Sequence, residues 1–228
     1  MSKKIAKQYN DFSQTYSDNF EAQDEVGNKR FYEMLSTVEL DGKKLLDVGC
    51  GDGADMLNYE KRGAAASGID PADEFIAGIQ QRSPQFDVQV GKGESLPYKD
   101  ATFDVVVSKY ALQTSTDVPK VFDEIARVLK PGGYFVFLSK HPFRQFMEKT
   151  KTYKQDINYF EQQVVDSFIF EGKIHLREPS HTMGEYFSPA VLANFDLLDY
   201  LEDYEFPASE QINEYTYPTF FVAKLQRR

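Results

Sequence analysis

The chain has 228 residues, enough for one α/β domain that buries a substantial core without disulfides or structural metals. Its 36 acidic and 26 basic residues give a formal charge of −10, the wrong sign for a surface that must neutralise a phosphate backbone. Nucleic acid is therefore not an expected partner. A small anionic metabolite stays possible, because net charge governs long-range fields more than local recognition.

The cysteine and histidine content restricts the chemistry further. Cys50 is the single cysteine and cannot form an internal disulfide, and three histidines without a second cysteine do not predict a zinc site, so no metal is expected. No run of about 18 apolar residues occurs, and no signal peptide or membrane span is predicted. These features together predict a cytoplasmic protein.

The N-terminal segment is expected to form helices that pack onto the core. An aromatic stretch comes first, with Tyr9, Phe12, Tyr16 and Phe20. The range Glu25 to Val38 then carries apolar residues at roughly helical spacing, namely Val26, Phe31, Leu35 and Val38.

The run from Lys43 to Leu138 alternates short apolar segments with longer helical patterns, which is typical of βαβ units around a mostly parallel sheet. The predicted strands are Lys44 to Val48, Ala65 to Asp70, Phe86 to Val90, Phe103 to Ser108 and Tyr134 to Leu138. Helices are predicted near 53–62, 72–82 and 117–129. We expect a single domain over residues 1–228, with its core at about 43–138.

Residues 140–180 do not continue this alternation of strands and helices. Two short apolar segments flank Gly172 and predict a hairpin that turns there. A last helix is predicted at about 188–195, before two apolar stretches, Leu197 to Phe206 and Thr219 to Leu225, that would complete the sheet.

A glycine loop joins the first predicted strand to the helix after it. The strand Leu45 to Val48 runs directly into Gly49-Cys50-Gly51-Asp52-Gly53. Glycines in such a turn permit positive φ and let a ligand approach the backbone, while the helix presents free N–H groups and a partial positive charge. A nucleotide-type ligand is indicated, although a glycine-rich turn without a ligand stays open.

Two cofactor classes compete for this loop. Gly49, Gly51 and Ala54 satisfy the dinucleotide pattern G-x-G-x-x-A, and Asp70 sits where an acid could bind a ribose. A pyrophosphate is disfavoured by nearby carboxylates, and this loop has three in or beside it: Asp47, Asp52 and Asp55. A ligand with a cationic amino acid end and no phosphate suits the loop better.

Four segments in order resemble the motifs of class I S-adenosylmethionine-dependent methyltransferases. They are Asp47 to Gly53, Ser67 to Asp70, Gly91 to Tyr98 with Phe103 to Val106, and Val128 to Gly133. Together they cover about residues 45–138 and resemble the small-molecule enzymes of the type 11, quinone-biosynthesis-like group. The resemblance implies an α/β, Rossmann-like fold with a mostly parallel seven-stranded sheet and helices on both faces. It also implies N-terminal helices and a cap insertion after the fifth strand, at about 140–186.

The resemblance implies S-adenosylmethionine as the cofactor and S-adenosylhomocysteine as the product. Asp47 would face the amino acid end of the cofactor, and Asp70 the ribose hydroxyls. Gly93 and Glu94 would lie on the adenine side, where Lys92 replaces an acid that family members commonly carry. The implied contacts are completed by Gly49, Cys50, Gly51, Pro71, Ser108 and Tyr16. Two alternatives remain open: Asp70 could cap the following helix, and Tyr16 could simply pack.

The expected activity is transfer of the methyl group to a small-molecule acceptor by in-line displacement, with O-, N- or C-methylation left open. Such a reaction needs the acceptor held in line and water excluded, and it needs a base only if the acceptor must lose a proton. An NAD(P)-dependent oxidoreductase and a cofactor-binding module without turnover are the alternatives. The oligomeric state is not predicted.

The cap insertion, residues 140–186, holds the candidates for acceptor binding and catalysis. His181 and His141 are the candidate bases, because the first lies where the resembling family often carries a histidine and the second directly follows the fifth strand. Either could instead be a capping or surface group. Lys140 and Arg144 could hold an acceptor's carboxylate, although cations beside a loop are usually solvated.

Overall fold

The computed structural model describes residues 2–15, 25–169 and 173–228, which form an α/β fold. The helices are α1 (Ser2–Asp11), α3 (Glu25–Leu35), α4 (Ala54–Lys61), α5 (Asp73–Arg82), α6 (Val118–Val128), α7 (Pro142–Thr152) and α8 (Gly184–Phe187). Short 3₁₀ turns are η2 (Leu112–Thr114), η3 (Val191–Asn194), η4 (Ala208–Glu210) and η5 (Ile212–Glu214). The strands are β1 (Lys44–Val48), β2 (Ala65–Asp70), β3 (Asp87–Val90), β4 (Phe103–Lys109), β5 (Leu129–Lys140), β6 (Val164–Ile169), β7 (Ile174–Pro179), β8 (Phe195–Asp203) and β9 (Phe220–Arg227).

Seven of these strands form one sheet in the order β3-β2-β1-β4-β5-β9-β8. The strands from β3 to β5 pair in parallel, and β9 runs antiparallel to both of its neighbours. The predicted Rossmann-like fold class is therefore confirmed. The strand order reverses between β1 and β4, and ligands of open α/β sheets bind at the carboxyl ends of the strands at such a point.

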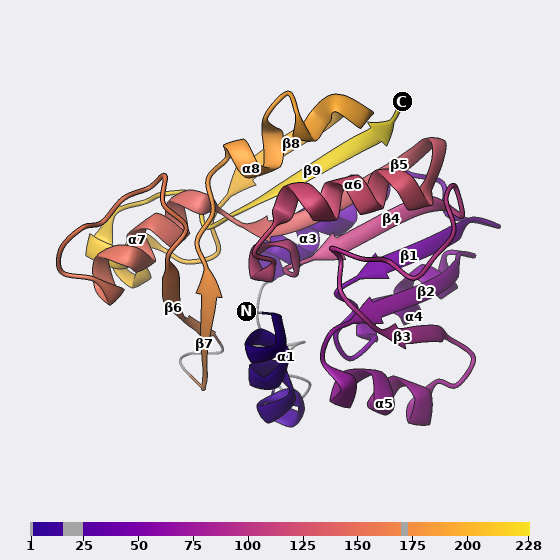
Figure 1. The fold of residues 1–228 in the computed structure, drawn as a ribbon, viewed down its shortest axis with the longest axis horizontal. Coiled ribbons are helices and arrows are strands. Elements are labelled where there is room, and N and C mark those ends of the chain that lie inside the picture. The colour runs from indigo at the N-terminus through magenta and orange to yellow at the C-terminus, as the bar shows by residue number, and fades with distance from the viewer. Residues whose placement is uncertain (1, 16–24, 170–172) are drawn as a thin grey trace.

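Both faces of the sheet are buried under helices, because successive residues of a strand point to opposite sides. On one face Leu46 and Phe135 belong to the cluster formed with α6. On the other face Leu45 and Val136 belong to the cluster formed with α3, to which Tyr59 of α4 also belongs. The sheet is thus held rigidly between two helical layers, as Figure 1 shows, and it fixes the loops at its carboxyl edge.

The cap insertion lies beside the sheet and holds α7 and the hairpin β6-β7 (Figure 1). The hairpin itself was predicted, and its strands pair antiparallel from Val164 with Pro179 to Ile169 with Ile174. The predicted turn at Gly172 falls outside the described residues.

Helix α1 lies between α5 and the hairpin (Figure 1). The side-chain amide of Gln8 donates to the backbone oxygen of Arg177 at 3.1 Å, and the Gln8 oxygen accepts from the Arg177 N–H at 2.8 Å. On its other side Asn10 is hydrogen-bonded to Asp73 and to the N–H of Glu74. Helix α1 therefore joins the cap to the glycine-loop side of the molecule.

One helix was not predicted, and one predicted helix is wrong. The segment after the fifth strand contains α7, which begins at Pro142 behind a His141 side chain that accepts the N–H of Phe143. The helix predicted at 188–195 is replaced by α8 and the short turn η3, with Ser188 extended between them. Proline at 189 drives the preceding residue out of the helical region, which ends α8 there.

None of the helices among the described residues is long and apolar enough to cross a bilayer.

Candidate functional site

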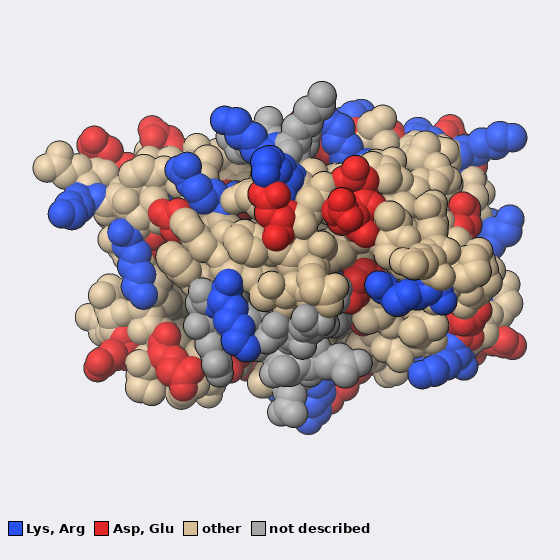
Figure 2. All heavy atoms as spheres, turned by 90° about the horizontal axis from the view of Figure 1, so that it is seen from below, with Lys and Arg blue, Asp and Glu red and all other residues tan. Residues whose placement is uncertain are grey.

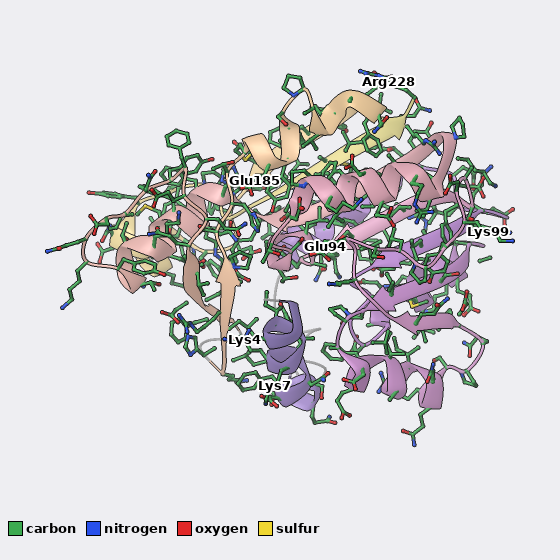
Figure 3. The ribbon with its side chains drawn as sticks, in the orientation of Figure 1. Lys4, Lys7, Glu94, Lys99, Glu185 and Arg228 are labelled. Atoms are coloured by element: carbon green, nitrogen blue, oxygen red, sulfur yellow. The ribbon has the colours of Figure 1, made fainter. Side chains whose placement is uncertain are left out.

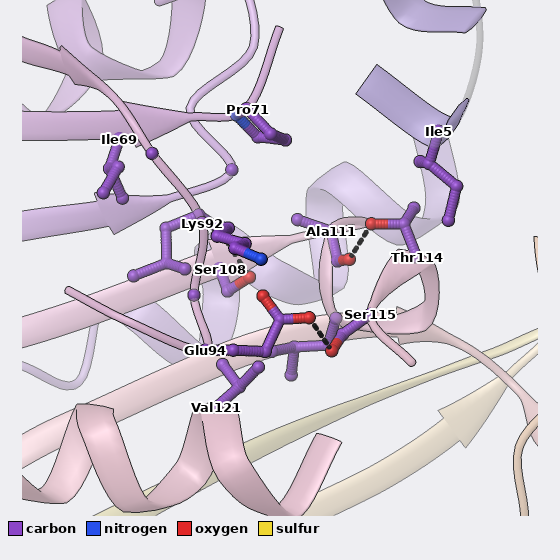
Figure 4. A pocket seen from close by; sticks show the side chains of 15 residues that line it. Ile5, Ile69, Pro71, Lys92, Glu94, Ser108, Ala111, Thr114, Ser115 and Val121 are labelled. Atoms are coloured by element: carbon purple, nitrogen blue, oxygen red, sulfur yellow. Dashed lines mark hydrogen bonds between the residues drawn. The ribbon is translucent and has the colours of Figure 1, made fainter. Parts of the chain in front are cut away.

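A cleft opens at the carboxyl ends of β1 and β4, where the strand order reverses. The cleft is lined by Ile5, Val48, Gly49, Ile69, Pro71, Gly91, Lys92, Gly93, Glu94, Ser108, Ala111, Leu112, Thr114, Ser115 and Val121. Figure 4 shows these side chains arriving from α1, from the ends of β1, β2 and β4, and from α6. The cleft thus brings together five of the residues that were predicted to contact the cofactor: Gly49, Pro71, Gly93, Glu94 and Ser108.

The glycine loop forms one wall of the cleft. Gly49 has φ of 85°, a conformation that strains any residue with a Cβ, and a Cβ there would also overlap the side chain of Ala111. The N–H groups of Gly49 and Cys50 donate to the backbone oxygen of Ile69 at 2.7 and 3.2 Å. The loop is thereby tied to β2 and keeps its backbone close to the cleft.

Asp47 lies beneath the loop, at the end of β1, and is 2% exposed. Among the described residues its Oδ1 has no hydrogen-bond partner. Burial raises the pKa of this carboxyl well above its usual range, and Asp55 and Asp70 raise it further, while Lys109 opposes them. A buried carboxylate with an unpartnered oxygen is costly unless a cation or donor meets it.

Asp70 ends β2 and is tied to the loop as well as to the next helix. Its Oδ2 accepts from the N–H of Gly51 at 3.0 Å, and its Oδ1 accepts from the N–H of Ala72 at 2.8 Å. Burial raises the pKa of Asp70 to about 6, against the lowering effect of these two bonds. Asp70 therefore closes the turn before α5 and does not cap that helix, whose N-cap residue Ala72 has no side-chain cap hydrogen bond. The two bonds leave lone pairs on both Asp70 oxygens for further donors, since a carboxylate has about four acceptor sites.

The loop after β3 forms the opposite wall. Glu94 accepts the hydroxyl of Ser115 at 2.7 Å, and Figure 4 shows Glu94 and Lys92 beside each other at the cleft. A side chain at position 93 would be crowded, because a Cβ there would lie 2.9 Å from a methyl of Val121 and 3.2 Å from one of Val48. Figure 3 places Glu94 near the middle of the molecule.

The remaining predicted contacts differ in how they meet the cleft. Ser108 is fully buried and donates its hydroxyl to the backbone oxygen of Val48 at 2.8 Å. Cys50 packs its side chain into the cluster with Met56 and Ile76. The described residues that line the cleft do not include Asp47, Cys50, Gly51 and Asp70. Gly51 gives its N–H to Asp70, and Tyr16 falls outside the described residues.

His141 is not among the described residues that line the cleft. Its Nδ1 accepts the N–H of Phe143, so Nε2 carries the proton and donates to Glu202 at 2.8 Å. Burial lowers the pKa of His141, and the Glu202 carboxylate counters that shift in part. Both ring nitrogens are engaged in holding α7 and β8.

His181 is 2% exposed and lies one layer behind the cleft. Its Nε2 is 3.0 Å from the backbone oxygen of Gln113, which can only accept, so Nε2 donates. Its Nδ1 lies 3.4 Å from Glu185. Gln113 stands between Leu112 and Thr114, two residues that line the cleft, so His181 supports the cleft wall from the cap.

The cations beside His141 are buried in the cap, which corrects the expectation that they are solvated. Lys140 pairs with Glu178 and Glu148, and its Nζ donates to the hydroxyl of Ser167. Arg144 pairs with Glu148 at 3.2 Å and with Glu205 at 3.0 Å. Glu178 and Glu205 lie far along the chain from these cations, so a loop-level sequence pattern could not predict those two pairs.

Several lining residues were not predicted from the sequence. Ile5 reaches the cleft from α1, and nothing in the sequence places that helix there. Ala111, Leu112, Thr114 and Ser115 follow β4 directly, and the rule that ligands gather at strand carboxyl ends could have found them.

Known proteins resemble the chain in sequence and in fold. A family model described as "Methyltransferase domain" matches residues 46–137. Phthiotriol/phenolphthiotriol dimycocerosates methyltransferase 1 of Mycobacterium ulcerans is 33% identical over 122 residues, which are 52% of this chain and 45% of that protein. The biotin biosynthesis bifunctional protein BioHC of Cellvibrio japonicus is 30% identical over 158 residues, 69% of this chain and 31% of that protein. The chain thus spans about half the length, or less, of these curated relatives.

The structural match extends beyond the core. An S-adenosylmethionine dependent methyltransferase from Mesorhizobium loti superposes with a TM-score of 0.70 at 22% identity, covering 87% of this chain and 96% of that one. The strand order, the glycine loop at the switch point and the family match agree with one another. Residues 46–137 are thus similar to a methyltransferase domain, and the fold of the chain is that of S-adenosylmethionine-dependent methyltransferases.

Proposed function

We propose that the chain binds S-adenosylmethionine in the cleft and transfers its methyl group to a small-molecule acceptor. The observation that carries this proposal is the Asp47 carboxyl, buried under the glycine loop with an oxygen that accepts no hydrogen bond from the described residues. Such an oxygen suits the ammonium group of an amino acid. A dinucleotide would instead bring a pyrophosphate toward Asp47, Asp55 and Asp70, and like charges repel strongly where water is excluded.

The residues around the cleft fit the other parts of this cofactor. Asp70 would accept the ribose hydroxyls, beside the backbone of Gly51. The adenine would lie between Pro71 and the backbone around Gly93, with Glu94 as a possible acceptor in place of the acid that Lys92 replaces. Ser108 would lie at the methionine end, below the loop.

The bound cofactor supplies a methyl group on a sulfonium, ready for in-line displacement. The chain has to hold the acceptor opposite that group and keep water out. Ile5 and the wall at Leu112 and Thr114 enclose the cleft on the side nearest the cap. The acceptor would enter between this wall and the cap insertion, residues 140–186.

A small molecule suits the surface better than nucleic acid does. The formal charge is −10, and the face shown in Figure 2 carries acidic and basic side chains interspersed, without a basic stripe along it. A phosphate backbone would need such a stripe.

Calorimetry with S-adenosylhomocysteine, and separately with NAD⁺, tests the cofactor. We expect S-adenosylhomocysteine to bind and NAD⁺ not to bind. Methyl incorporation from labelled S-adenosylmethionine across a metabolite panel then tests the activity. Binding of NAD⁺ alone would contradict the proposal. Cofactor binding without incorporation into any metabolite of the panel would favour a binding module.

The catalytic role of His181 and His141 stays a prediction, and His181→Gln tests it. Glutamine can place an N–H donor near the position of Nε2 and keep the bond to the Gln113 oxygen. We expect this variant to stay within about threefold of the wild type in S-adenosylhomocysteine affinity and turnover, and His181→Leu to lose both, because a lost buried hydrogen bond costs about 1–3 kcal/mol. Unchanged affinity with turnover about 100-fold lower in His181→Gln would instead identify His181 as the base.

A further inference from the structure

Lys109 is a buried lysine at the carboxyl end of β4, outside the lining of the cleft. Its side chain is 5% exposed, and its Nζ lies 2.6 Å from Asp55 and 2.8 Å from the side-chain oxygen of Asn28. A lysine is rarely buried this deeply unless it is paired. The two partners belong to different helices, so Lys109 connects α3 with the first turn of α4.

The same cluster holds α4 in place behind the glycine loop. Asp55, in the first turn of α4, accepts the hydroxyl of Tyr32, and that hydroxyl accepts from Asn58 at 3.0 Å. Lys109 lies 5.8 Å from the centre of the Tyr32 ring. The position of Asp55, and of the helix that begins at the loop, therefore depends on this cluster.

Lys109 also sets the charge around Asp47. Asp55 and Asp70 disfavour the charged form of Asp47, and Lys109 favours it. With Lys109 present, the Asp55 charge is paired, and Asp47 keeps an oxygen that accepts no hydrogen bond from the described residues. Without Lys109, Asp47 would face two carboxylates and lose the cation that favours its own ionisation.

We propose that Lys109 is a positioning residue for the cofactor: by pairing with Asp55 it holds the first turn of α4 behind the glycine loop and leaves the Asp47 carboxyl available to the ammonium group at the cofactor's amino acid end. This inference rests on the proposed function, because it assumes that S-adenosylmethionine occupies the cleft. Lys109 touches neither the cofactor nor the acceptor and acts through Asp47.

Two ligands separate this role from a merely structural one. S-adenosylhomocysteine has the amino acid end, and 5′-methylthioadenosine lacks it but keeps the ribose and adenine. We expect Lys109→Met to lower the affinity for S-adenosylhomocysteine at least about tenfold, the equivalent of one unit of carboxyl pKa, and to leave that for 5′-methylthioadenosine within about threefold. Titration calorimetry measures both.

Charge balance can be restored in a double variant. Asp55→Asn together with Lys109→Met removes one charge of each sign, so the field at Asp47 returns close to its original value, and asparagine can still accept from Tyr32. We expect this variant to recover most of the affinity for S-adenosylhomocysteine. Lys109→Met alone leaves the Asp55 carboxylate buried without its partner. If that variant fails to fold, the double variant still tests the proposal.

Proton release gives a second readout that does not need turnover. Because the pKa of Asp47 is raised, an ammonium group placed beside it lowers that pKa and expels a proton from any protonated fraction. Binding heats in buffers of different ionisation enthalpy should show this release with S-adenosylhomocysteine and a smaller one with 5′-methylthioadenosine. The ionisable groups that interact electrostatically with Asp47 are Tyr32, Cys50, Asp55, Tyr59, Asp70 and Lys109.

The possible results lead to different conclusions. Equal losses for both ligands in Lys109→Met would show that Lys109 only shapes the loop, and a double variant that folds without recovering affinity would remove the charge argument. If the wild type binds neither ligand, the proposed function itself fails, and the role of Lys109 fails with it.

Discussion

Asp70→Asn should weaken the binding of S-adenosylhomocysteine and 5′-methylthioadenosine by about 100-fold or more, since two hydrogen bonds to a charged acceptor are worth roughly 3 kcal/mol. In the proposed complex the carboxylate accepts both ribose hydroxyls, and an amide offers one acceptor and a donor instead. The side chain also accepts the N–H groups of Gly51 and Ala72, so asparagine leaves one of them without its partner. Titration calorimetry with both ligands measures the change.

The same carboxyl predicts a pH dependence. Its pKa is raised to about 6, so the charged form that accepts ribose hydroxyls is lost as the pH falls through that value. The affinity for 5′-methylthioadenosine, which does not reach Asp47, should fall over this range in the wild type and stay flat in Asp70→Asn. The effect on stability has the opposite sign: the contribution of Asp70 is present below its ordinary pKa of 3.8 and is lost as the pH rises through about 6.

Asp52→Asn is the matched control for the loss of charge. Asp52 lies in the same loop, and its Oδ1 accepts the N–H of Ala54 at 3.2 Å, a bond that asparagine can keep. We expect its ligand affinities to remain within about threefold of the wild type, because Asp52 is half-buried and the variant keeps this hydrogen bond. If both variants lose affinity equally, the loop responds to net charge, and ribose recognition by Asp70 is contradicted.

Local patterns in the sequence were sufficient to predict the core of the fold. The strands at Lys44 to Val48 and Ala65 to Asp70 have the predicted bounds, because each is a short segment between a turn and a predicted helix in the βαβ pattern. The glycine loop was placed correctly for a similar reason: its function depends on neighbours in the sequence.

The structure of the cap could not be predicted from local sequence patterns in the same way. Helix α7 is aromatic and charged, without a clean apolar stripe, and it is stabilised by contacts from far along the chain, such as Arg144 with Glu205 and Lys149 with the backbone oxygens of Asn158 and Glu161. The roles of His141 and His181 depend on partners at Glu202 and Gln113. Residue type suggested a base, whereas only the three-dimensional partners show how each ring nitrogen is used.

Gly49→Ala should lower the affinity for both ligands by about 10–100-fold, since left-handed backbone costs an alanine roughly 1–2 kcal/mol and the new methyl must also displace a neighbour. The backbone at Gly49 has φ of 85°, and a Cβ there would overlap the Cβ of Ala111. Both residues line the cleft, so any relief of the overlap changes the shape of the site.

Two further variants separate the overlap from the backbone strain. Gly132→Ala carries comparable strain, with φ of 77°, but nothing lies within 4 Å of its Cβ and it is not part of the cleft lining. It should lower the melting temperature and leave both affinities unchanged. Gly49→Ala combined with Ala111→Gly removes the overlapping methyl and should recover part of the lost affinity. If Gly49→Ala binds both ligands as well as Gly132→Ala does, the glycine loop does not form the wall of the ligand site.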